Sequence, residues 1–151
     1  MKTILVPVDL SRASARVCSV ASALAKSLRG RLVLLHVVPP QTVALRAPGF
    51  ATAEVRGMLA ALERRSAEEL LELGRWLKKS RRPVRTVQVT GDPVPTILRQ
   101  AAEVKADLIV MGSHGQSAAY DLLVGSNTHR VLRRTKWPVL VVPIGRPAAA
   151  G

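Results

Sequence analysis

Short runs rich in Val, Ile and Leu alternate along this chain with longer segments in which apolar residues recur at helical spacing. The runs are Ile4 to Val8, Leu32 to Val38, Val84 to Val89, Leu108 to Met111 and Val139 to Ile144. Continuous apolar runs of this length are typical of parallel strands that are buried on both faces. The alternation therefore predicts a doubly wound α/β fold, in which a five-stranded parallel sheet carries helices on both faces.

The first helix is expected from Ala13 to Leu28, with Ser11 as its N-cap and Gly30 just past its end. The longest helix should run from about Thr52 to Lys79. Its apolar face is predicted to consist of Val55, Leu59, Leu62, Leu70, Leu73 and Leu77. The connection before it, Pro39-Pro40 followed by Gln41 to Phe50, is either a flap over the site or an ordinary surface loop.

The turn Gly91-Asp92-Pro93 leads into a third helix, and Ser126 leads into a fourth. Their predicted apolar stripes are Ile97, Ala101 and Val104 in the third helix, and Val131 and Leu132 in the fourth. With 151 residues the chain is long enough for one domain, which we expect over residues 1–144. The content of Pro and Ala in residues 145–151 predicts a flexible tail.

The net charge of +13 is compatible with binding to nucleic acid, with an anionic surface, or with a solvated basic exterior. Cations cluster from Arg75 to Arg85 and from Arg130 to Lys136, and Trp76 is the only aromatic residue within these two stretches. This pattern favours solvated faces over a specific nucleic-acid site. No apolar run is long enough to cross a membrane, and no secretory signal is evident, so we expect a cytoplasmic protein. The lone Cys18 is interpreted as a buried, inert thiol.

In open parallel sheets, ligands bind beyond the carboxyl ends of the strands. The residues predicted at that edge are Asp9, Val37, Val38, Gly91, Asp92 and the run Gly112-Ser113-His114-Gly115. The glycine run follows a strand, and Gly125-Ser126-Asn127 comes nine residues later at the start of a helix. Glycine lets backbone N–H groups approach an anion closely, and a helix N-terminus adds unpaired donors. The pattern predicts a nucleotide site.

Several of these segments together resemble the universal stress protein family. The matching segments are Val6 to Ser11, Leu34 to Val37, Asp107 to Gly115, Gly125-Ser126 and Pro138 to Val142. The spacing Gly-x2-Gly-x9-Gly-Ser is the version found in ATP-binding members. The resemblance implies a Rossmann-like fold of the adenine nucleotide alpha hydrolase-like type. It also implies a homodimer that pairs through the last strand, Val139 to Val142.

The resemblance further implies which residues contact the nucleotide. They are Pro7, Val8, Asp9, Val37, Met111, Gly112, His114, Gly115, Gly125, Ser126 and Asn127. Asp9 and Met111 would lie near the ribose and phosphates, while the backbone of Val37 would meet the adenine edge. The triphosphate would be held by the Ser126 hydroxyl and by the backbone N–H groups of Gly115, Gly125, Ser126 and Asn127. A carboxylate beside a polyphosphate makes sense when Mg²⁺ lies between them, so Asp9 is also the candidate metal partner.

Each of these residues also has a purely structural interpretation. Asp9 and Ser126 are both suited to cap a helix, and the glycines are suited to tight turns that hold no ligand. His114 could contact phosphate or simply position the loop, whereas His36 is interpreted as a hydrogen-bonded core residue. The Gly-Lys-Ser/Thr of a P-loop is absent, so we expect at most slow ATP hydrolysis. A dimeric interaction module with an empty site and an FMN-binding, flavodoxin-like carrier are the alternative functions.

Overall fold

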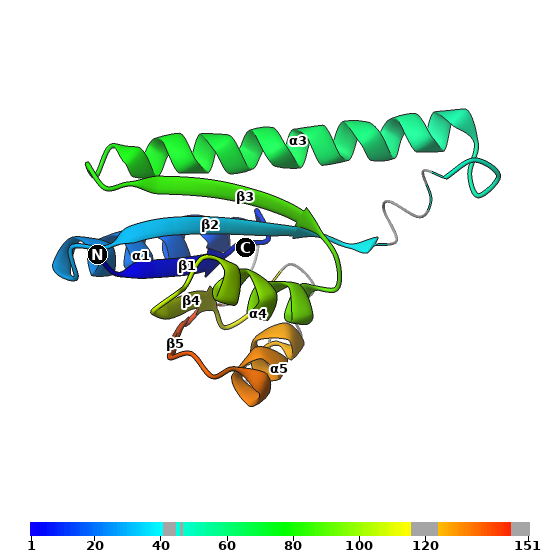
Figure 1. Ribbon diagram of the computed structural model, residues 1–151. Coiled ribbons are helices and arrows are strands. Elements are labelled where there is room, and N and C mark those ends of the chain that lie inside the picture. Colours follow the sequence, from blue (N-terminus) through cyan, green and yellow to red (C-terminus); the bar gives the residue numbers. More distant parts are fainter. Residues whose placement is uncertain (41–44, 46, 116–123, 146–151) are drawn as a thin grey trace, which may run out of the picture.

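Five parallel strands form one sheet in the order β3-β2-β1-β4-β5 (Figure 1). The computed structural model describes residues 1–40, 45, 47–115 and 124–145. The strands are β1 (Thr3–Pro7), β2 (Arg31–Val38), β3 (Val84–Thr90), β4 (Leu108–Gly112) and β5 (Val139–Val142). Each predicted strand is present, and the predicted parallel arrangement is confirmed. Two strands end before the predicted runs do, since Val8 lies beyond β1 and Ile144 lies beyond β5.

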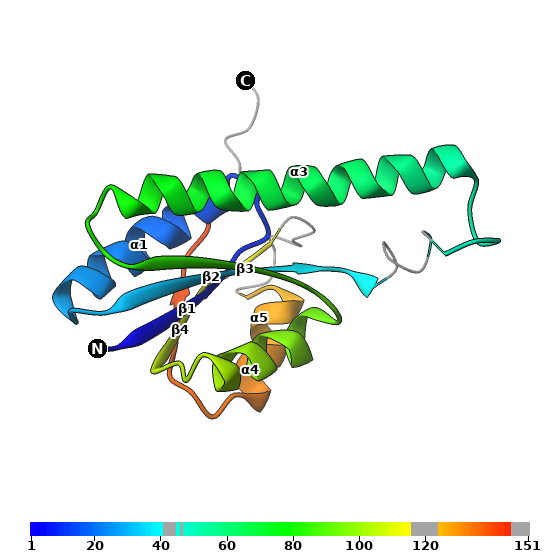
Figure 2. The same cartoon turned by 45° about the horizontal axis from the view of Figure 1, so that its top comes forward.

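Helices cover both faces of this sheet. They are α1 (Ala13–Ser27), α3 (Ala53–Lys78), α4 (Pro93–Glu103) and α5 (Ser126–Arg134). Figures 1 and 2 show α1 and α3 on one face and α4 and α5 on the other. Successive side chains of a strand point to opposite faces, so Ile4 packs in the core under α1 and α3, while Leu5 packs in the core under α4 and α5. This explains why the central strands β1 and β4 are apolar at nearly every position, whereas β3 at the edge of the sheet also carries Arg85 and Gln88.

The order of the strands places a switch point between β1 and β4. From β1 the chain winds outward through β2 to β3, and it then returns to the other side of β1 to add β4 and β5. The loops that follow β1 and β4 therefore leave the sheet in opposite directions. A crevice opens between such loops at the carboxyl ends of the strands.

The ends of the helices differ in detail from the predictions. Arg12, not Ser11, occupies the N-cap position of α1, and Gly125, not Ser126, occupies that of α5. At the end of α1, Arg29 takes the left-handed conformation with a φ of 50°. Gly30 is needed for lack of space and not for its backbone conformation, since a Cβ atom there would lie 2.8 Å from the backbone oxygen of Lys2.

The predicted apolar face of α3 is only half right. Leu70 and Leu77 are buried, with exposed fractions of 2% and 3%, but Leu62 is 55% exposed and Val55 is 39% exposed. Figure 1 shows the reason: the amino-terminal half of α3 extends beyond the sheet that its carboxyl-terminal half covers. In α5, Val131 is buried as predicted, but Leu132 is 41% exposed.

Three predictions fall partly or wholly outside the described residues. The tail beyond Gly145 is one, and residues 41–44 and 46 of the predicted flap are another. The third is the interior of the glycine loop, residues 116–123. Among the described helices, none combines the length and the apolar character that are needed to span a bilayer.

Candidate functional site

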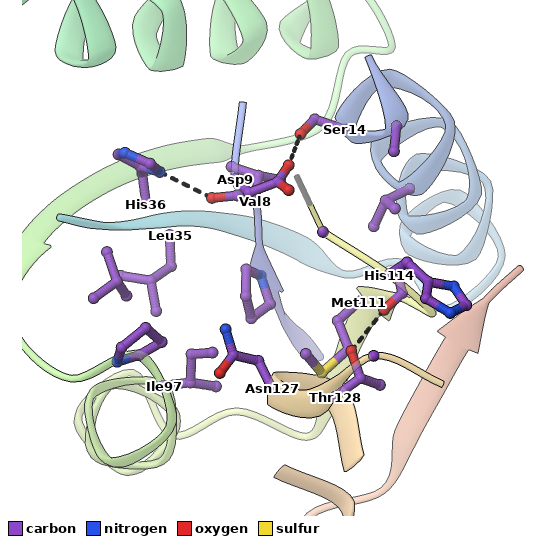
Figure 3. A pocket seen from close by; sticks show the side chains of 18 of the residues that line it. Val8, Asp9, Ser14, Leu35, His36, Ile97, Met111, His114, Asn127 and Thr128 are labelled. Atoms are coloured by element: carbon purple, nitrogen blue, oxygen red, sulfur yellow. Dashed lines mark hydrogen bonds between the residues drawn. The ribbon is translucent and has the colours of Figure 1, made fainter. Parts of the chain in front are cut away.

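A cavity of about 400 Å³ opens at the carboxyl ends of β1, β2 and β4, at the switch point of the sheet (Figure 3). Every residue that the sequence assigned to the site lines this cavity. They are Pro7, Val8, Asp9, Val37, Met111, Gly112, His114, Gly115, Gly125, Ser126 and Asn127. The fold thus brings together four segments of the chain, and more than a hundred residues separate the first segment from the last.

Some residues that were predicted at the same edge do not line the cavity. Gly91 lies against Thr96, whose Oγ1 would clash with a Cβ atom at position 91, so this glycine serves the turn into α4. Asp92 lies 3.6 Å from Arg130 in an ion pair. Ser113 is buried, and its hydroxyl oxygen accepts a hydrogen bond from the Ile144 N–H at 2.9 Å.

Asp9 both organises the start of α1 and forms a wall of the cavity. Its Oδ1 accepts hydrogen bonds from the Ser11 N–H at 3.0 Å and from the Ser14 hydroxyl at 3.2 Å. Leu10, between them, has a left-handed φ of 63°, which turns the chain sharply after the strand. Figure 3 shows Asp9 and Asn127 approaching the cavity from opposite sides. Asp9 therefore braces the turn before α1 and does not cap the helix, whose N-cap is Arg12.

The glycines of the motif allow close approach between neighbouring segments. A Cβ atom on Gly115 would lie 2.9 Å from Asp9 Oδ2, and one on Gly125 would lie 3.2 Å from the Ser113 oxygen. The Gly125 N–H donates to that same Ser113 oxygen at 2.6 Å. Gly125 thus lines the cavity with its N–H already engaged, contrary to the expectation that this N–H would face a ligand. Its contribution is the tight junction between the β4 loop and α5.

The first turn of α5 supplies the remaining donors. The N–H groups at the start of a helix have no acceptor within it, and the helix dipole makes this end attractive to anions. Ser126 and Asn127 occupy this turn and line the cavity. The Thr128 hydroxyl donates to the Gly112 oxygen at 2.8 Å, which fixes the helix start against the end of β4.

The sequence missed a second group of lining residues. They are Ala13, Ser14, Val17, Leu35, His36, Pro39, Pro93, Ile97 and Thr128. His36 is hydrogen-bonded as predicted, since its Nδ1 donates to the Val8 oxygen at 3.0 Å, yet it is only half-buried and faces the cavity. Pro39 follows the end of β2 directly, in the connection predicted as a possible flap, and Pro93 is the first residue of α4, in the turn predicted to lead into that helix.

The cavity has an apolar part and a set of polar groups. Leu35, Val37, Ile97 and Met111 line the part beside α4, whereas the polar groups come from two opposite sides, Asp9 from the loop after β1 and Asn127 from the start of α5. The lining contributed by the described residues contains no Lys or Arg, and Asp9 is its one acid. No group of three or more His, Cys, Asp or Glu side chains is placed to hold a metal ion among the described residues. A single carboxylate nonetheless fits a Mg²⁺ ion that arrives with phosphates, because Mg²⁺ needs few protein ligands there.

This sheet, its switch-point cavity and the glycine-bounded helix start define a doubly wound α/β protein with a ligand-sized site at the carboxyl edge. The model of the universal stress protein family matches residues 1–143. The chain belongs to the universal stress protein family.

Individual members of the family align over nearly the full length of the chain. A universal stress protein of Thermus aquaticus is 35% identical over 93% of this chain and 98% of its own length. The solved structure of protein MJ0577, from Methanocaldococcus jannaschii, superimposes with a TM-score of 0.81 over 97% of this chain and 98% of that chain, at 24% identity. A universal stress protein solved in complex with cAMP has a TM-score of 0.67, is 26% identical, and covers 94% of this chain and 96% of that chain.

Proposed function

We propose that this protein binds an adenine nucleotide in the switch-point cavity, with Mg-ATP as the preferred form, and acts in the cytoplasm as a nucleotide-responsive regulator. The observation that carries the proposal is the convergence of all the motif residues on one cavity, where the wall formed by Gly115 faces Asp9. The cAMP complex of a 26% identical relative supports an adenine nucleotide as the class of ligand.

The division of the cavity gives the ligand a direction. The apolar side, with Leu35, Ile97 and Met111, suits the flat faces of adenine, and the backbone of Val37 lies at the end of β2 beside it. The polar groups, Asp9 on one side and the start of α5 on the other, suit the ribose and phosphates. A volume of about 400 Å³ lies within the usual range of small-molecule sites.

Binding, rather than rapid turnover, is the proposed activity. Efficient phosphoryl transfer relies on a cation fixed at the β and γ phosphates and on a group that orients the attacking water. The lining residues named above include no Lys or Arg that could place a cation at the β and γ phosphates. When Mg²⁺ is bound with the nucleotide, it would neutralise phosphate charge, with Asp9 as its one protein partner.

Calorimetry with Mg-ATP, Mg-ADP, AMP and cAMP tests this function. Wild type is expected to bind, and Gly115→Val is expected to lose binding because its side chain would enter the space against Asp9. Gly57→Val is the matched control, since a Cβ atom at Gly57, on the exposed part of α3, meets nothing within 4 Å. Wild type that binds none of these nucleotides at millimolar concentration would refute the proposal and favour the interaction module with an empty site.

We also propose that the protein is a homodimer that pairs through β5. This strand lies at the edge of the sheet, and such an edge leaves a row of backbone groups available for another chain. The oxygens of Pro138 and Val142 accept hydrogen bonds from the β4 side, at 3.0 and 2.8 Å. Alternation along the strand then directs the N–H of Val141 outward.

Size-exclusion chromatography with light scattering tests the dimer. Val141→Pro removes the outward N–H and leaves the pairing with β4, so we expect it to shift the protein toward monomer. Val141→Ala removes side-chain atoms but keeps the N–H, and it should remain dimeric. A dimer that survives Val141→Pro with an unchanged urea midpoint would place the interface elsewhere.

A further inference from the structure

A second cavity lies at the opposite, amino-terminal edge of the sheet. Its volume is about 530 Å³, and it is lined by Arg31, Leu32, Lys78, Arg81, Arg82, Pro83, Val84 and Arg85. Five of these eight residues are Arg or Lys, and none is acidic. We call it the basic cleft. It occupies the starts of β2 and β3 and the turn between α3 and β3, so the whole sheet separates it from the nucleotide cavity.

Ordered backbone presents the cations of the basic cleft. In the turn after α3, the Ser80 N–H donates to the Leu77 oxygen and the Arg81 N–H donates to the Lys78 oxygen, both at 3.0 Å. Arg81 has a left-handed φ of 58°, which L residues with long side chains rarely adopt. The Leu32 N–H donates to the Pro83 oxygen at 2.9 Å, which ties the turn to β2.

The charges of the basic cleft are not balanced by neighbouring acids. None of the ion pairs between described residues includes a cation of the cleft. Arg31 donates from Nε to the Thr3 hydroxyl at 2.8 Å, a neutral partner. The acid at this edge, Asp107, is held instead by Lys2 and by the Thr3 N–H, and the hydrogen bond from Lys2 lowers its pKa. Like charges held together repel, so a bound anion would relieve that repulsion.

We propose that the basic cleft is a binding site for condensed phosphate, that is, a chain of three or more linked phosphate groups. Guanidinium groups bind phosphate oxygens through paired N–H donors, and Arg81, Arg82 and Arg85 lie within five positions of one another. The lining contains no aromatic side chain on which a base could stack. The site therefore fits a compact polyanion better than a nucleic-acid strand.

Calorimetry with inorganic tripolyphosphate at roughly physiological ionic strength tests this site. The triple variant Arg81→Gln, Arg82→Gln, Arg85→Gln is expected to bind at least about tenfold more weakly than wild type, because charge-assisted hydrogen bonds are lost. The matched control, Arg16→Gln, Arg64→Gln, Arg133→Gln, lowers the net charge equally at exposed positions on α1, α3 and α5, and it should bind like wild type.

Three outcomes would overturn the proposal. Equal losses in both triple variants would mean that only net charge matters. Loss in Gly115→Val with retention in the Arg81, Arg82, Arg85 variant would place the tripolyphosphate in the nucleotide cavity. Tighter binding of a single-stranded oligonucleotide than of tripolyphosphate, abolished by the same triple variant, would identify a nucleic-acid site. The nucleotide site is tested separately, because the triple variant leaves its lining intact.

Discussion

Gly115 lies close against Asp9 in the wall of the cavity: a Cβ atom at position 115 would lie 2.9 Å from Asp9 Oδ2, closer than van der Waals contact allows. The two residues come from the loops after β4 and β1, which leave the sheet on opposite sides of its switch point. Asp9 is also fixed from behind, since its Oδ1 accepts from the Ser11 N–H and the Ser14 hydroxyl. The carboxylate is thus held in place, and its charge and its shape can be tested separately.

Replacing Asp9 with Asn keeps an oxygen that can accept from Ser11 and Ser14 but removes the negative charge. If Mg²⁺ lies between Asp9 and the phosphates, Mg-ATP should bind roughly tenfold more weakly, which is about 1.4 kcal/mol. ATP without a divalent ion should bind as well or better, because a carboxylate that repels phosphate is gone. Calorimetry with and without EDTA measures both. Equal weakening in the two conditions would contradict a role for Asp9 in metal binding.

Gly30→Ala is expected to destabilise the fold by about 1–3 kcal/mol, as overpacking does elsewhere. The new Cβ atom would lie 2.8 Å from the backbone oxygen of Lys2, which also accepts the Arg31 N–H and cannot easily move. Gly57→Ala serves as the control, because it lies in the interior of α3 with open space around it and should stabilise by about 0.5–1 kcal/mol. Urea unfolding measures both, and a Gly30→Ala variant as stable as wild type would show that the chain shifts to admit the Cβ atom.

Much of the site was predictable because parallel strands place their carboxyl ends at one edge. Asp9, Val37 and Gly112 each follow or end an apolar run, so their convergence follows from the topology alone. Residues such as His36 and Ile97 were missed because their own segments look like ordinary core. The sequence around such a residue does not show whether its side chain lines the cavity at the edge of the sheet or is covered by a helix.

Other errors arose where tertiary contacts outweigh local signals. Ser11 is a favourable N-cap residue, but Asp9 accepts its N–H and the helix begins two residues later. Gly30 was predicted just past the end of the first helix, and the residue that takes the left-handed conformation there is Arg29. The sequence shows where a glycine stands. Only the structure shows whether glycine is required there by the backbone conformation or by the lack of space for a Cβ atom.

Because Cys18 is buried, the free energy of unfolding should fall as the pH rises above about 9. Burial raises the pKa of its thiol from 9.0 to about 12. The thiol is neutral in both states below pH 9, so its contribution is fully present there and is lost as pH rises from 9 to 12. By about pH 10 the loss is about 1.4 kcal/mol.

Comparison of wild type with Cys18→Ala isolates this effect, because the other groups that titrate at alkaline pH are shared. Urea unfolding at about pH 7 and about pH 10 should show the larger loss of stability in wild type. Parallel losses in the two proteins would mean that the Cys18 thiolate is accommodated in the fold.

The two halves of α3 should respond differently to the same substitution. Leu70 is 2% exposed and packs with the core under α1, so Leu70→Ala should destabilise by about 2–5 kcal/mol. Leu62 is 55% exposed on the part of α3 that extends beyond the sheet, so Leu62→Ala should change stability by less than about 0.5 kcal/mol. Urea unfolding at low protein concentration measures each variant. A large loss in Leu62→Ala that grows with protein concentration would show that another chain covers this half of the helix.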